Sequence, residues 1–179
     1  MLARFFRAPP MREAAYQLYT RTVEAAREPR FYETLGVPDT LDGRFELISL
    51  HVALLLRRLS GEPAAKEFAQ EIFDAMFADL DRALREMGTG DLGVGKQVKR
   101  MAAAFYGRAR AYERGLAGTE DLGDALRRNL YGTVTVNDAV VGVMAEWVKQ
   151  AAAGLVGQTL DRLVAGEVRF PPPPAAPAP

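Results

Sequence analysis

The chain has 179 residues, 49% of them hydrophobic, and a formal net charge of zero at pH 7. This length and balance allow one globular domain to bury a core of its own. The lack of Cys and the presence of a single His exclude disulfides, thiolate chemistry and any metal site that needs several Cys or His side chains. Zero net charge gives no general attraction to nucleic acid. We therefore expect no nucleic-acid partner, no metal and no cofactor.

Helical periodicity runs through most of the chain, while strand signals are almost absent. The sequence predicts an all-α single domain of about six helices. The first expected helix follows Pro10 and ends near residue 28. The second is capped by Asp39 or Asp42 and runs to about residue 60. Because it carries apolar side chains on two faces, it should lie at the centre of the fold.

The later helices are expected at about 63–87, 94–118, 119–131 and 135–165. Gly88 should stop the first of these, Thr119 should cap the third, and the Thr135-x-x-Asp138 pattern predicts a capping box for the last. The Pro-rich end of the chain is expected to be extended and disordered. The expected organisation is an N-terminal segment (1–8), a helical domain (9–166) and a disordered tail (167–179).

The stretch GTGDLGVGKQVK, residues 88–99, contains two phosphate-binding patterns, G-x-x-x-x-G-K and G-x-G-x-x-G. Both patterns bind phosphate only where a β-strand leads into the glycine loop. Here a predicted helix precedes the loop, and Gln97 follows Lys96 where a magnesium-binding Ser or Thr would be needed. We therefore interpret the stretch as a corner that joins two helices, with the chain turning through Gly90, Gly93 and Gly95.

No stretch approaches the roughly 18–20 apolar residues that span a bilayer. The N-terminal sequence MLARFFRAPP lacks the long apolar region of a signal peptide, so we expect a cytoplasmic protein. The segment 2–7 combines apolar and basic side chains. It could touch a membrane surface or fold back onto the domain, and the sequence leaves both possibilities open.

His51 lies among leucines in the middle of the second predicted helix. A packed, hydrogen-bonded core histidine is the expected role. As a general base it would need a nucleophile and an orienting carboxylate. Glu71 and Asp74 are the available carboxylates, but no motif supports such a set, so we expect no enzymatic activity.

Two predicted helices carry opposite charge stripes. At 100° per residue, the acidic stripe of the third helix follows Glu67, Glu71, Asp74, Ala78 and Asp81. The basic stripe of the fourth helix follows Lys96, Lys99, Arg100, Arg110 and Arg114, and the small residues Ala103 and Gly107 lie at its middle. A charge stripe is usually a solvated face, but small residues at its centre favour the close approach of a partner helix, an acidic surface or lipid head groups. The candidate binding residues are Glu67, Glu71, Asp74, Asp81, Asp91, Lys96, Lys99, Arg100, Arg110 and Arg114.

Four phrases occur in order along the chain. They are F-Y-x-x-L-G-V-P-D-T at 31–40, G-R-F-E-L at 43–47, M-G-x-G-D-L-x-V-G-K at 87–96 and A-F-Y-G-R at 104–108. By these phrases, residues 31–130 resemble the ubiquinol–cytochrome c reductase (complex III) assembly chaperone family. The Arg- and Ala-rich composition is typical of a bacterial member.

The resemblance implies a non-enzymatic, all-helical assembly factor that binds a membrane-protein client. Mitochondrial members of the family assist the synthesis of cytochrome b and its assembly into complex III, together with a small partner protein. The implied partners are therefore cytochrome b or another complex III subunit and a small partner protein. The basic stripe would itself suit anionic lipid, at the cytoplasmic face of the inner membrane, or an acidic partner. The alternative is a helical module that binds a quinone, lipid or haem among Phe73, Met76, Phe77, Phe105 and Tyr106.

Overall fold

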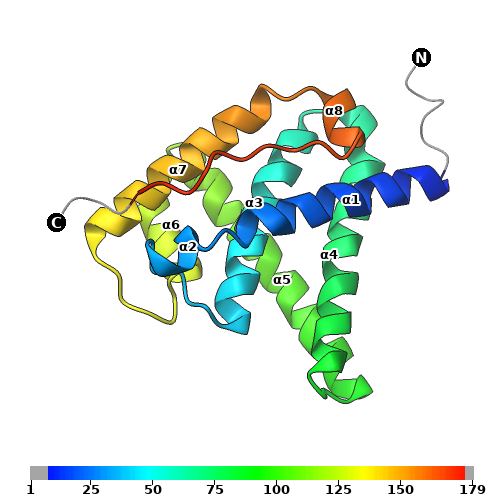
Figure 1. Cartoon of the computed structure of the whole chain (residues 1–179), viewed down its shortest axis with the longest axis horizontal. Helices are drawn as coiled ribbons and strands as arrows, with labels where there is room; N and C mark the ends of the chain where they lie inside the picture. Colours follow the sequence, from blue (N-terminus) through cyan, green and yellow to red (C-terminus); the bar gives the residue numbers. More distant parts are fainter. Residues whose placement is uncertain (1–7, 176–179) are drawn as a thin grey trace.

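A computed structural model describes residues 8–175, and every regular element in that range is helical (Figure 1). The elements are α1 (Ala8–Ala26), α2 (Arg30–Glu33), α3 (Leu41–Ser60), a 3-10 turn η2 (Pro63–Ala65), α4 (Lys66–Glu86), α5 (Asp91–Leu116), α6 (Leu122–Asn129), α7 (Asp138–Val156) and α8 (Leu160–Val164). Six of these described helices have eight residues or more, so the all-α prediction is confirmed. The segment 2–7, for which the sequence left contact with a membrane and packing onto the domain both open, lies outside the described residues.

Helix α3 is the centre of the fold, as its two apolar faces predicted. Leu47, Leu50 and Leu55 are fully buried, and the helix contacts α1, α4, α5 and α7. Its N-cap is Thr40, whose hydroxyl accepts a hydrogen bond from the Gly43 N–H at 3.1 Å. The expected caps, Asp39 and Asp42, are therefore wrong. Because α3 is packed on several sides, any polar group on it must find its partners inside the protein.

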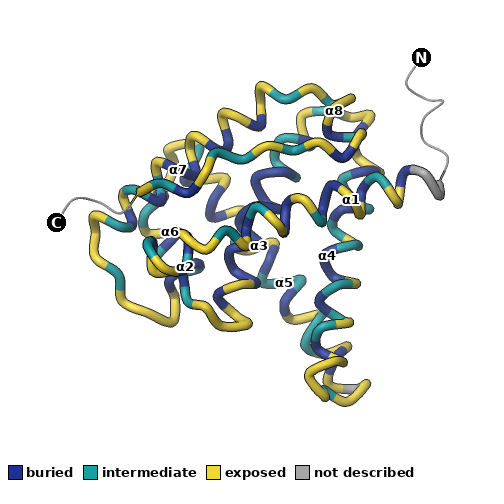
Figure 2. The backbone as a smooth tube through the Cα atoms, viewed as in Figure 1, coloured by how far each residue is buried: buried dark blue, intermediate teal, exposed yellow. Residues whose placement is uncertain are grey.

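Helices α4 and α5 form a hairpin whose tip projects from the rest of the molecule (Figure 1) and is exposed (Figure 2). Gly88 ends the first helix with a φ of 84°, as predicted. Gly90 is the N-cap of the second, and the Gly93 N–H already donates to the Gly90 carbonyl at 2.8 Å. Gly93 and Gly95 are therefore helical, and the expected start near residue 94 is wrong by about one turn.

The last two predicted helices begin and end at other residues than expected. Asp121, and not Thr119, caps α6 by accepting from the Asp124 N–H at 2.7 Å. Asn137 caps α7 in the same way, which replaces the predicted capping box. The chain leaves the helix after Val156 and forms the short α8, so the predicted single helix to residue 165 is divided at Gly157.

Residues 167–175 form an extended strap along the outside of the fold, seen in red in Figure 1. The extended backbone was predicted, but the expected disorder is wrong for these residues. The Trp147 indole N–H donates to the Pro171 carbonyl at 3.1 Å, and Pro173 is buried. Prolines restrict the backbone before it binds, so ordering the strap costs little conformational entropy. Residues 176–179 lie outside the described part of the chain.

Within the described residues, α7 is long and apolar enough to cross a membrane by length and composition alone, with a mean hydropathy of 1.3. The expectation that no segment is long and apolar enough to span a bilayer is therefore wrong for α7. In the fold, the helix contacts α3 and α6, and Met144, Trp147 and Val148 are buried in the core. Its apolar character therefore has a packing role inside the domain.

Candidate functional site

The acidic stripe lies on α4 beside α1. Glu67 and Asp74 are exposed, whereas Glu71 is partly buried. The Arg12 guanidinium of α1 lies 3.9 Å from the Glu71 carboxylate, and both residues line a groove of about 630 Å³ between the two helices. Helix α1 thus covers and partly neutralises the middle of the stripe. The most available negative charges are those of Glu67 and Asp74.

Asp81 and Asp91 meet near the tip of the hairpin, because both carboxylates bind Arg85. The Asp81 oxygen lies 2.6 Å from the Arg85 nitrogen, and Asp91 forms an ion pair with the same guanidinium. Sequence reasoning placed the two aspartates in the candidate site and missed Arg85, which lies four residues after Asp81. This arrangement ties the end of α4 to the start of α5. It gives both aspartates a structural role at the corner.

The basic stripe is exposed along α5. No ion pair within the described residues involves Lys96, Lys99, Arg100 or Arg110, whereas Arg114 lies 2.6 Å from Glu120. At the centre of the stripe, Ala103 and Gly107 are exposed, and a Cβ added to Gly107 would meet nothing within 4 Å. The helix therefore presents several unpaired positive charges around an open strip of small residues.

An apolar groove of about 330 Å³ lies between α3 and α5 and adjoins the basic stripe at Arg110. Tyr106 lines this groove, and 55% of its surface is exposed. Its ring stacks on that of Phe73, with 5.2 Å between the ring centroids. Phe105 and Phe77 continue this ring cluster into the interior. The aromatic residues proposed as a small-ligand pocket therefore fill the space with one another and leave one ring at the surface.

An ion pair between the buried Glu46 and the partly buried Arg108 joins α3 to α5. Burial raises the pKa of the Glu46 carboxyl, and its hydrogen bond with Arg108 opposes that rise. Within the described residues, Glu46 Oε2 and Arg108 Nε have no hydrogen-bond partner. Both residues line a cavity of about 440 Å³, with Arg100 and Arg128 also in its wall. Sequence reasoning missed the pair, although each member belongs to one of the phrases that carry the family resemblance.

His51 is completely buried, and its Nδ1 lies 2.8 Å from the Leu47 carbonyl oxygen. In the neutral ring that nitrogen donates to the carbonyl, which leaves Nε2 as an acceptor. Burial lowers the pKa of His51 to about 4. Phe31, Trp147 and Phe170 surround the ring, and no carboxylate is hydrogen-bonded to it. The predicted core role is confirmed, and Glu71 and Asp74 do not form a catalytic set with this histidine.

Among the described residues, no group of three or more His, Asp or Glu side chains is placed to hold a metal ion. The charged and aromatic residues gather on the two helices of one hairpin. This arrangement can bind a chain, a surface or a head group, while it offers no nucleophile with an activating base.

Comparison with known proteins gives consistent similarities to one family. The sequence pattern of the "Ubiquinol-cytochrome C chaperone" family matches this chain over residues 33–170. The chain is 29% identical over 164 residues to ubiquinol-cytochrome-c reductase complex assembly factor 1 of Xenopus laevis, covering 89% of this chain and 81% of that protein. It is 27% identical over 162 residues to the human protein of the same name, covering 89% of this chain but 54% of the human one.

The chain therefore spans just over half the length of its human relative. A solved structure agrees over nearly the whole chain: the crystal structure of the Cbp3 homolog from Brucella abortus has a TM-score of 0.80 and 37% sequence identity, covering 95% of this chain and 96% of that one. The family match over residues 33–170 covers most of the sequence. The protein belongs to the ubiquinol–cytochrome c chaperone family.

Proposed function

We propose that this protein is a non-enzymatic chaperone for the assembly of the ubiquinol–cytochrome c reductase complex, with newly made cytochrome b or another subunit of that complex as its client. The family match and the names of its relatives support this function. The structural observation that carries it is the apolar groove between α3 and α5, where the Tyr106 ring is exposed.

A membrane protein in assembly presents apolar segments whose cytoplasmic flanks are rich in Lys and Arg. The groove beside Tyr106 offers apolar contact to such a segment. The exposed carboxylates of Glu67 and Asp74 on the neighbouring helix offer negative charge to its basic flanks. One hairpin thus carries both kinds of contact, and the client is held by binding alone.

The basic stripe fits a different ligand, because it would repel the basic flanks of a client. Anionic lipid attracts clustered Lys and Arg at a membrane surface by about 1 kcal/mol per residue. We assign the stripe to the anionic lipid of the cytoplasmic face of the inner membrane, where the client is inserted. A small acidic partner protein is the competing occupant, and the experiment below separates the two.

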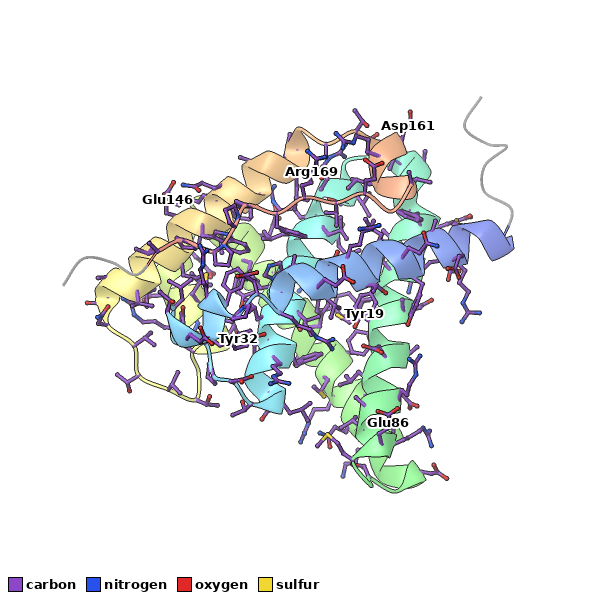
Figure 3. All side chains as sticks on the ribbon, viewed as in Figure 1. Tyr19, Tyr32, Glu86, Glu146, Asp161 and Arg169 are labelled. Carbon is purple, nitrogen blue, oxygen red and sulfur yellow. The ribbon has the colours of Figure 1, made fainter. Side chains whose placement is uncertain are left out.

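Charge reversal tests the two faces separately. Glu67→Lys with Asp74→Lys, at the two exposed carboxylates of α4, should lower client capture in a pull-down, while helicity by circular dichroism stays unchanged. The matched control is Glu33→Lys with Glu146→Lys, two exposed carboxylates on α2 and α7. Figure 3 shows Glu146 on α7, away from the hairpin. Unchanged capture by the α4 variant, or equal loss in the control, would reject the acidic docking face.

Lys99→Glu with Arg110→Glu should abolish salt-sensitive binding to vesicles that contain anionic lipid. The control Arg30→Glu with Lys149→Glu changes the net charge equally on exposed residues elsewhere. Equal binding by both variants would reject the lipid assignment. Loss of a co-purified protein in place of lipid binding would assign the stripe to an acidic partner.

A further inference from the structure

The strap, residues 167–175, is held as an extended peptide is held by a receptor. The Gln158 side-chain amide forms hydrogen bonds with both backbone polar groups of Arg169. Its Nε2 donates to the Arg169 carbonyl at 2.8 Å, and its Oε1 accepts from the Arg169 N–H at 2.9 Å. The Trp147 indole N–H donates to the next carbonyl but one, that of Pro171. Figure 3 shows Arg169 on the strap where it runs beside α7 and α8.

The groove beneath the strap has an aromatic floor. The Phe170 ring lies 4.8 Å from the His51 ring, and the Trp147 and Phe31 rings lie 5.0 Å and 5.5 Å from the same imidazole. Further along the strap, Pro173 is buried. An aromatic groove with an indole donor is the arrangement by which protein modules bind preformed proline-rich segments.

The strap leaves part of the hydrogen-bonding capacity of its groove unused. In the described part of the chain, the one backbone–backbone hydrogen bond that holds it is from the Glu167 N–H to the Arg162 carbonyl, at 2.9 Å. Residues 171–174 are all proline and have no N–H to donate. The buried Nε2 of His51, in the floor of the groove, has no donor. A segment that supplies the same ring and prolines with one more donor would bind this groove better than the strap does.

We propose that the groove formed by His51, Trp147 and Gln158 is a recognition site for an extended segment in which an aromatic residue precedes prolines. The chain's own strap fills it in cis, and a partner protein's segment of the same chemistry displaces the strap. This site is separate from the proposed client surface, because Trp147 and Gln158 lie on α7 and in the turn after it, whereas that surface is lined by other residues of α3, α4 and α5.

Trp147 is the single tryptophan of the chain, so its fluorescence reports on the strap directly. In the full chain, Arg169→Pro removes the N–H that Gln158 accepts, and Phe170→Ala removes the ring that covers His51. The double variant should show red-shifted Trp147 emission and faster proteolysis of its tail than the wild type. A synthetic peptide of residues 167–179 should then bind it saturably and restore the emission.

Two matched controls define the groove. The same peptide with Phe170→Ala should bind at least tenfold more weakly. In the strap-loosened chain, Gln158→Ala should weaken the peptide by at least tenfold, while Gln150→Ala, at an exposed position of α7, should leave its affinity unchanged. The intact chain should bind the peptide more weakly than the loosened chain, by about the ratio of the tethered strap's effective concentration, about 1 mM, to the dissociation constant of the peptide.

Failure of the peptide to bind a loosened chain that keeps its helical circular dichroism would overturn the proposal. Equal binding to the intact and loosened chains would also overturn it, because the peptide would then occupy another site. If the double variant loses helicity, Arg169→Pro alone, a change at an exposed residue, carries the same test. If the wild type forms a dimer as its concentration rises while the Trp147 emission stays unchanged, each strap binds the groove of the other copy. That result would overturn the proposal that the strap fills its own groove in cis.

Discussion

At the residue scale, His51 is the group whose protonation the fold resists most clearly. Burial lowers its pKa to about 4 from an ordinary value of 6.5, so the unfolded chain binds a proton between these pH values that the folded chain does not. The stability that the neutral ring contributes is therefore complete above pH 6.5 and is lost as the pH falls to 4. By linkage the loss is roughly 3 kcal/mol.

Urea denaturation at a series of pH values from 7 to 4 measures this effect. The wild type should lose stability over that window, and His51→Leu should lose about 3 kcal/mol less. A packing change in the variant shifts its free energy of unfolding equally at every pH. The difference between pH 7 and pH 4 therefore still reports on the protonation of His51. Identical pH dependence in the two proteins would show that His51 is protonated or exposed in the folded chain.

The Glu46–Arg108 pair gives a second prediction at this scale. Arg108→Met should leave the Glu46 carboxylate buried without its partner and cost about 3 kcal/mol of the free energy of unfolding. The double variant Glu46→Leu with Arg108→Met should recover most of that loss. Arg44→Met is the control, because its partner Asp39 is exposed and such pairs contribute about 0–1 kcal/mol. Equal costs for the two single variants would contradict the buried role.

At the element scale, two glycines of the hairpin corner should respond in opposite directions to alanine. Gly88 has a φ of 84°, so Gly88→Ala should lower the free energy of unfolding by about 1 kcal/mol. Gly95 lies inside α5, where an added Cβ meets nothing within 4 Å, so Gly95→Ala should raise it by about 0.5 kcal/mol. Chemical denaturation checks both, and a loss at Gly95 would mean that α5 begins after this residue.

The elements show what periodicity can and cannot predict. The stripes of α4 and α5 were predicted correctly as faces because helix geometry fixes them within one element. The predicted caps were wrong for the helices that Thr40, Asp121 and Asn137 cap in the structure. Several neighbouring Asp, Asn and Thr residues can each cap a helix, and the backbone conformation decides which one does. The Glu46–Arg108 pair joins residues 62 positions apart. Spacing along a sequence contains no information on how two helices cross.

At the scale of the whole molecule, the all-α fold followed from composition and periodicity, but the placement of the strap did not. A proline-rich sequence has no periodicity to read, and its partners Trp147 and Gln158 belong to α7 and the turn after it. The covering of Glu71 by α1 has the same origin, since it depends on how two helices pack. The sequence therefore identifies candidate charges, and the fold decides which of them remain available to a partner.

The central claim, that this chain assists assembly of the ubiquinol–cytochrome c reductase complex, is tested most directly in the host cell. Deleting the gene should lower the cytochrome b absorbance of membranes and the amount of assembled complex on native gels. The wild-type gene should restore both, and a gene carrying Lys99→Glu with Arg110→Glu should restore neither. Normal cytochrome b and normal assembled complex in the deletion strain would contradict the claim.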